Sequence, residues 1–151
     1  MRDSFGNEVS AAHLGGYVAG GDEATYYPEL WTWLVHEMGV RSVLDVGCGD
    51  GVAVDYFVGL GCTVIGLDGV GFDHPLIRLH DFTWGAPLLL GGYDLCWSCE
   101  FVEHVEERYV PNILAAFRAS ELVLMTHAGP GQDGHHHVNC RTSDYWRGAM
   151  A

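Results

Sequence analysis

The chain has 151 residues, the usual size of a single domain, and 48% of them are hydrophobic. Its formal net charge is −13, and all seven basic residues are arginines. A field of this sign repels phosphate backbones, so we expect no extended nucleic-acid surface. No run of about 18 uncharged apolar residues is present, and the first residues lack an export pattern. We therefore expect a soluble, cytoplasmic protein without membrane contact.

The cysteines are five in number, an odd count, and several lie in or beside apolar runs. This pattern is typical of reduced, buried thiols rather than of a disulfide framework. Cys96 and Cys99 form one C-x-x-C pair. A zinc or redox site there stays open beside simple core packing.

The pattern of apolar residues predicts alternating helices and strands. Residues 1–25 are Gly-rich and weakly periodic, and apolar residues then recur at helical spacing between Leu30 and Met38. Pro28 suits the start of this helix and Gly39 its end. Further along, we predict strands at 41–46, 62–67, 76–79, 93–97 and 121–126, and helices at 51–60 and 105–119.

Strands rich in Val, Ile and Leu, separated by crossover-length segments, are typical of a parallel sheet covered on both faces. Right-handed crossovers then give a Rossmann-like, doubly wound α/β domain. We expect a mainly parallel sheet of five core strands in the order 3-2-1-4-5. Residues 1–151 would form one domain, with a lid and helix over 1–40, the core over 41–127, and a His-rich active-site loop and C-terminal segment over 128–151.

The first predicted strand runs into a glycine-rich turn, G-C-G-D-G at residues 47–51. Glycine has no Cβ, so a ligand can approach the backbone of such a turn closely. Asp45, just before the turn, can meet the ammonium of a bound amino acid, and Asp68, after the second strand, can take both hydroxyls of a ribose. Asp81 and Phe82 follow the third strand, where they offer an acceptor for an adenine amine and an aromatic wall.

The run V-L-D-V-G-C-G-D-G at residues 43–51 resembles the first motif of class I S-adenosylmethionine-dependent methyltransferases, and Asp68 matches their second. The resemblance covers residues 41–127. It implies S-adenosylmethionine as the cofactor, with its methionine part at the glycine-rich turn and its adenosine between Asp68 and the pair Asp81 and Phe82. The candidate cofactor-binding residues are Asp45, Gly47, Cys48, Gly49, Asp50, Asp68, Gly69, Asp81, Phe82 and Tyr17.

Two of these assignments have alternatives. The glycine-rich turn can instead be an ordinary Rossmann turn that binds NAD or another nucleotide. Against this, a dinucleotide fingerprint has glycine where this chain has Val52. Tyr17 belongs to the Gly-rich N-terminal segment, which suits a closing lid. Simple packing explains Tyr17 equally well.

The segment after the fourth strand should face the reacting group, because ligands bind beyond the carboxyl ends of parallel strands. It contains E-F-V-E-H at residues 100–104. If this stretch is helical, Glu100, Glu103 and His104 share one face. Two carboxylates and an imidazole suit Mg²⁺, Mn²⁺, Fe²⁺ or Zn²⁺, and a further ligand would come from the histidines at 135–137.

This E-x-x-E-H pattern is similar to the acidic motif of two metal-dependent groups, the O-methyltransferases of ubiquinone biosynthesis and the enzymes that 2′-O-methylate small-RNA 3′ ends. The resemblance implies a divalent metal that clamps substrate oxygens and lowers the pKa of the attacking hydroxyl. Metal-free relatives use a Glu-His pair as a base or to anchor the methionine end, so this role stays open. The candidate catalytic residues are Glu100, His104, His127 and His136, and the candidate metal ligands are Glu100, Glu103, His104 and His136.

The roles of His127 and of the histidines at 135–137 also have structural alternatives. His127 can be a structural histidine with its hydrogen bonds satisfied, and the three consecutive histidines can be a solvated loop. The leading hypothesis is an O-methyltransferase acting on a small-molecule or sugar hydroxyl. An RNA 3′-end methyltransferase is disfavoured by the acidic field, and a cofactor-binding module without turnover is the third alternative. The superfamily's sheet usually has two further strands that are missing here, which suggests such a module. Without them, the strand at 121–126 would be an exposed edge, and we expect a homodimer through that edge.

Overall fold

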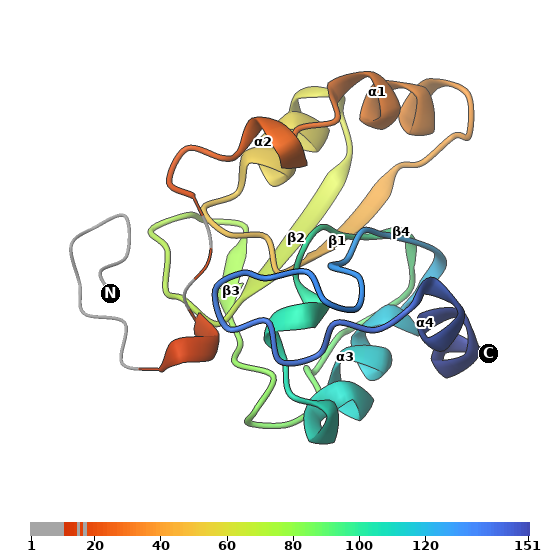
Figure 1. Cartoon of the computed structure of the whole chain (residues 1–151). Helices are drawn as coiled ribbons and strands as arrows, with labels where there is room; N and C mark the ends of the chain where they lie inside the picture. Colours follow the sequence, from red (N-terminus) through yellow and green to blue (C-terminus); the bar gives the residue numbers. More distant parts are fainter. Residues whose placement is uncertain (1–10, 15, 17) are drawn as a thin grey trace.

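The computed structural model describes residues 11–14, 16 and 18–151. Within these residues the chain forms a five-stranded sheet in the order β3-β2-β1-β4-β5 (Figure 1). Every pairing in it is parallel. The predicted α/β class and strand order are therefore confirmed. The strands are β1 (Ser42–Val46), β2 (Thr63–Asp68), β3 (Ile77–Leu79), β4 (Tyr93–Ser98) and β5 (Ser120–Met125).

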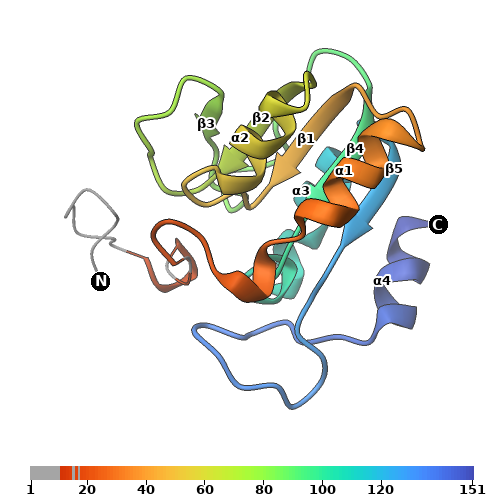
Figure 2. The same cartoon turned by 90° about the horizontal axis from the view of Figure 1, so that it is seen from above.

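Helices cover both faces of this sheet, as the doubly wound prediction requires. Figures 1 and 2 show α1 and α2 on one face and α3 and α4 on the other. Short 3-10 turns occupy Ala12–Leu14, Glu23–Thr25, Val102–His104 and Glu107–Tyr109. The helices are α1 (Pro28–His36), α2 (Val52–Gly59), α3 (Val110–Phe117) and α4 (Ser143–Met150).

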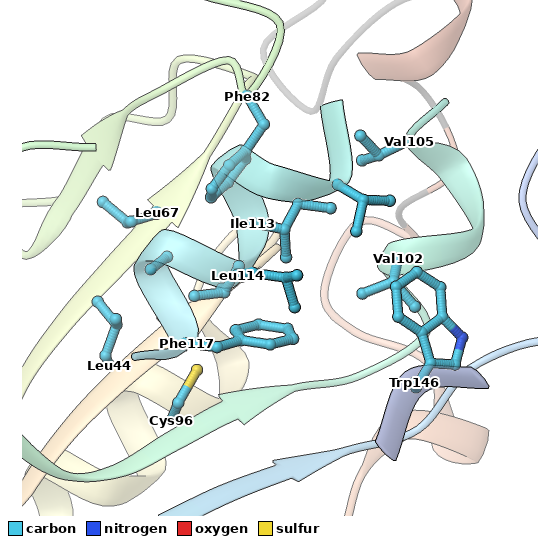
Figure 3. Packing of buried hydrophobic residues seen from close by; sticks show 13 residues of the cluster. Leu44, Leu67, Phe82, Cys96, Val102, Val105, Ile113, Leu114, Phe117 and Trp146 are labelled. Carbon is cyan, nitrogen blue, oxygen red and sulfur yellow. The ribbon is translucent and has the colours of Figure 1, made fainter. Parts of the chain in front are cut away.

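The two faces of the sheet enclose separate apolar clusters. Under α1 and α2, Trp31 and Phe57 pack against Trp97 of β4. Figure 3 shows the opposite cluster, where Phe117 of α3 and Trp146 of α4 pack on the sheet. Side chains alternate between faces along a strand, so β1, β2, β4 and β5 contribute to both clusters, whereas β3 adds Ile77 to the cluster under α1 and α2.

Two helices differ from the prediction. The helix expected over 105–119 begins as an α-helix only at Val110, because Glu106 is extended and a 3-10 turn follows it. Pro111 then fits the first helical turn, where its missing N–H costs nothing. Helix α4 was not predicted, although Thr142 carries a capping signal: its hydroxyl accepts from the Tyr145 N–H at 3.2 Å.

The C-x-x-C pair does not form a joint site. Cys96 is buried in the cluster under α3, whereas Cys99 packs with the cluster under α1 and α2. All five cysteines are free thiols. The Cys99 thiol instead contacts the Thr126 hydroxyl, with 3.1 Å between Sγ and Oγ1. Packing therefore explains these thiols better than zinc or redox chemistry.

β5 lies at one edge of the sheet, and its Leu122 is 36% exposed. Self-association along this edge stays a prediction. Among the described residues, no helix has both the length and the apolar character that crossing a membrane requires.

Candidate functional site

A cavity of about 390 Å³ lies at the carboxyl end of the sheet. Figure 2 shows the segments before α1 and after β5 on this same side of the molecule. The lining residues that the structure describes include no Lys or Arg, so no fixed positive side-chain charge offsets the acidic residues of the cavity. Its acidic residues are Asp22, Asp45, Asp50, Asp68, Asp81, Glu100 and Glu103.

The glycine-rich turn after β1 forms the floor of this cavity, with Gly47, Cys48 and Gly49 among its lining residues. Gly47 has a φ of +76°, and a Cβ added there would lie 2.4 Å from the Phe101 ring. Its N–H donates to the Leu67 carbonyl at 2.9 Å, which ties the turn to the end of β2. Only glycine meets both conditions at this position.

Asp45 lines the cavity from the end of β1. Its side chain is buried, and its Oδ2 has no hydrogen-bond partner among the described residues. Burial, with a further contribution from the charge of Asp68, raises the pKa of Asp45 to about 8. A buried carboxyl in this state can take up a cationic donor, whose charge would stabilise the ionised form.

Asp68 connects the glycine-rich turn to the loop after β2. Its Oδ2 accepts from the Gly49 N–H at 2.9 Å and its Oδ1 from the Val70 N–H at 2.8 Å. Burial raises the pKa of Asp68 to about 6, and these two backbone bonds oppose the rise. Each carboxylate oxygen retains a further lone pair, so both can accept from a ligand hydroxyl.

Asp81 and Phe82 lie at the far end of the cavity, where the N-terminal segment covers them. Burial alone would raise the pKa of Asp81. Hydrogen bonds from the Thr83 N–H and from His13 outweigh this effect, so the net shift of the pKa is downward. His13 Nε2 lies 3.0 Å from Asp81 Oδ2. In the same segment, Leu14 lies so close to Gly69 that a Cβ on that glycine would be 2.3 Å from it. An adenine at this end would therefore meet His13 and Leu14 as well as Asp81.

Asp50 is also at the cavity, but it holds the N-terminal segment: its Oδ2 accepts from the Gly20 N–H at 2.6 Å. Tyr17 lies outside the described residues.

The reactive side of the cavity brings Glu103, His104 and His137 together, with one ligand atom of each within 4.8 Å of the others. Glu103 is fully buried, its Oε1 accepts from the Ala128 N–H at 3.1 Å, and its Oε2 has no partner among the described residues. Burial first, and the charge of Glu100 second, raise the pKa of Glu103 to about 7. The group combines an uncommitted carboxylate oxygen with two imidazoles.

Glu100, also expected as a metal ligand, lines the same cavity but is not among the residues whose ligand atoms converge. Its segment is also not the helix that the spacing suggested. Residues Val102–His104 form a 3-10 turn, and Glu100 has a φ of +47°, in the left-handed region. Its N–H donates to the Thr126 hydroxyl at 3.1 Å, which secures this strained backbone. Such strain in a non-glycine residue is typical of functional sites.

His104 is held in one tautomer. Its Nδ1 lies 2.7 Å from the His135 carbonyl oxygen, so Nδ1 carries the proton and Nε2 keeps its lone pair. Burial, together with the neighbouring His137, lowers the pKa of His104, while the bond to the His135 carbonyl opposes this. His104 is therefore neutral at pH 7, as a base or a metal ligand must be.

Two histidines chosen from the sequence lie elsewhere. His136 does not line the cavity; its Nε2 is 3.6 Å from Glu106 Oε1, and its neighbours His135 and His137 line the cavity instead. His127 is also outside the cavity, with its Nε2 3.1 Å from the Ser143 hydroxyl. This contact fits the structural alternative for His127.

Other residues of the cavity could not be recognised as site residues from the sequence. His13 and His80 line the cavity although their surroundings in the sequence indicated nothing, and Trp31 was assigned only to the apolar face of a helix. Three consecutive histidines cannot be told apart in the sequence. Only the path of the folded loop shows that His137, and not His136, reaches the cavity.

The sheet order, the glycine-rich turn after β1 and the acid at the end of β2 together define a class: the chain has the fold of the class I S-adenosylmethionine-dependent methyltransferases. It is similar to magnesium protoporphyrin IX methyltransferase from Synechocystis, solved with bound S-adenosylmethionine, at 17% identity and a TM-score of 0.58, covering 80% of this chain and 63% of that one. A sugar N-methyltransferase from Streptoalloteichus matches at 20% identity and a TM-score of 0.60, covering 80% of this chain and 59% of that one.

Among curated proteins, the chain is similar to a ubiquinone biosynthesis O-methyltransferase of Thiobacillus denitrificans, at 30% identity over 83 residues. This match covers 44% of the chain and 34% of that enzyme, so it spans about a third of the relative's length. No family model matches the chain.

Proposed function

We propose that the chain binds S-adenosylmethionine and transfers its methyl group to a hydroxyl oxygen of a small molecule. The observation that carries this proposal is the buried Asp45 carboxyl, whose Oδ2 has no partner within the described residues and faces no Lys or Arg among the cavity lining. The cofactor brings an ammonium and a sulfonium into this acidic cavity. The ammonium would supply the missing donor, and Asp68 would accept from both ribose hydroxyls.

The direct test is titration calorimetry of the chain with S-adenosylmethionine, followed by detection of S-adenosylhomocysteine formed with candidate hydroxyl acceptors. Micromolar binding is expected. Binding without any turnover across acceptors would favour the alternative of a cofactor-binding module, and absence of binding would refute the proposal.

The pH dependence of cofactor binding follows from Asp45. Because its pKa in the free protein is about 8, the carboxyl carries a proton at pH 6 that must leave when the ammonium binds. Affinity for S-adenosylmethionine should therefore rise between pH 6 and 8, by up to about tenfold per pH unit, and level off above. Calorimetry in two buffers of different ionisation enthalpy would count the released proton. An affinity that is independent of pH over this range would contradict the assignment.

Residues Glu103, His104 and His137 suit a divalent cation, because one carboxylate oxygen and two imidazole nitrogens can converge there. Such a cation would lower the pKa of the acceptor hydroxyl. The chain's own contribution is to present a neutral His104 Nε2, which accepts a proton or coordinates the ion, and to hold it through the His135 carbonyl. The buried Glu103 Oε2, with no partner among the described residues, supports a ligand at this point.

Treatment with EDTA should abolish methyl transfer, and added Mg²⁺, Mn²⁺ or Zn²⁺ should restore it. The variant His137→Ala should need a higher metal concentration for half-maximal activity, whereas His36→Ala, on the outer surface of α1, should behave as the wild type. Activity that EDTA leaves intact would exclude the metal. In that case His104 would act as the general base alone.

The acceptor should be neutral or cationic, because the described cavity lining offers seven acidic side chains and no Lys or Arg to hold an anionic group. This favours a small-molecule hydroxyl over an RNA 3′ end, whose adjacent phosphate would be repelled. We also propose a cytoplasmic location, since five free thiols suit a reducing compartment.

A further inference from the structure

Three buried polar atoms on cavity-lining residues lack a hydrogen-bond partner among the described residues: Trp31 Nε1, Asp45 Oδ2 and Glu103 Oε2. Two are acceptors, and the proposed function gives each of them a ligand. The third, the indole N–H of Trp31, is a donor. A buried donor without a partner is unfavourable, so its place at a cavity wall indicates a ligand acceptor.

Trp31 and Asp45 border the same part of the cavity. The Trp31 ring packs edge-on against Trp97, with 5.6 Å between ring centroids, and Figure 2 shows α1 lying over the side of the sheet that β4 and β5 form. Trp97 is the register partner of Asp45 across β1 and β4. The unpartnered donor and the unpartnered acceptor thus flank one aromatic side chain on one face of the sheet.

An α-amino acid presents both an ammonium and a carboxylate. Proteins usually hold a carboxylate with Arg or Lys, but the described lining residues include neither. A neutral N–H can serve in their place, and Trp31 Nε1 is the buried side-chain donor on these lining residues that has no partner among the described residues.

We infer that the indole N–H of Trp31 donates a hydrogen bond to the carboxylate of the cofactor's methionine end, while Asp45 accepts from its ammonium. This inference rests on the proposed function. It makes Trp31 a cofactor-binding residue as well as a core residue, because its ring packs against Tyr26, Tyr56, Phe57 and Trp97 while its N–H has no hydrogen-bond partner among the described residues.

The test compares two ligands, S-adenosylmethionine and its decarboxylated form, which keeps the ammonium and sulfonium but lacks the carboxylate. The variant Trp31→Phe retains an aromatic ring and loses the N–H. Calorimetry should show that it binds S-adenosylmethionine about tenfold or more weaker than the wild type and binds the decarboxylated ligand equally well. Trp146→Phe is the matched control, since its indole N–H is also buried without a described partner but lies outside the cavity.

Equal losses for both ligands in Trp31→Phe would assign Trp31 a packing role only and overturn the inference. If the wild type binds neither ligand, the proposed function itself fails. A second measurement avoids mutation: in ¹⁵N-tryptophan-labelled wild-type protein, one of the five indole N–H signals should shift with S-adenosylmethionine and not with the decarboxylated form. No such ligand-dependent signal would refute the inference even if Trp31→Phe does not fold.

Discussion

Replacing Asp68 with alanine is expected to weaken S-adenosylmethionine binding by about 100-fold or more. A hydrogen bond to a charged group contributes about 1.5–3 kcal/mol, and the ribose would form two with this carboxylate. The same change leaves the Gly49 and Val70 N–H groups without their present acceptor, so the turn under the cofactor also loses its support. Both effects act in the same direction, which makes this the largest binding loss we predict.

Titration calorimetry measures this loss, and a thermal melt of each variant shows whether it remains folded. Asp73→Ala is the control, because Asp73 is an exposed acid after the same strand and does not line the cavity. It should bind the cofactor as the wild type does. An Asp68→Ala variant that is folded and binds normally would place the ribose elsewhere.

Replacing His104 with alanine is expected to reduce methyl transfer by about 10²–10⁴-fold while the affinity for S-adenosylmethionine changes little. The lone pair on His104 Nε2 is set by the bond from Nδ1 to the His135 carbonyl, and the lowered pKa keeps the ring neutral at pH 7. Removing the ring removes the proton acceptor, or one ligand of the metal. Neither change touches Asp45 or Asp68.

Formation of S-adenosylhomocysteine measures turnover in this variant, and calorimetry measures binding. His36→Ala again serves as the control, because His36 lies outside the cavity on α1. A comparable loss of turnover and of cofactor affinity in His104→Ala would indicate that His104 holds the cofactor's methionine end instead.

The pKa of Asp45 also links cofactor binding to folding. Its pKa is about 8 in the folded chain and 3.8 for an unperturbed aspartate. Between these two pH values the folded chain therefore keeps a proton on Asp45 that the unfolded chain has lost. The contribution of this group to stability is complete below pH 3.8 and declines as the pH rises to about 8. Bound cofactor should reverse part of this decline, because its ammonium stabilises the ionised carboxyl.

Local patterns in the sequence were sufficient to predict the strands of the sheet and their order. Strands β1 to β5 are short apolar runs whose order follows from right-handed parallel crossovers, and both features are local or general. Asp45 and Asp68 could be chosen for the same reason: each stands at a strand end, and parallel strands bring their carboxyl ends to one edge. The start of α3 was missed because an extended Glu106 and Pro111 interrupt an apolar pattern that continues through them.

Periodicity and chain direction act over a few residues, so they are enough to predict the parallel sheet, the glycine-rich turn and the acids beside it. The folded chain is needed to see which histidine of the loop reaches Glu103, that His13 contacts Asp81, and that Trp31 lies at the cavity wall. These contacts join segments far apart in the chain. Their geometry depends on loop paths and on packing across the sheet, which no local pattern records.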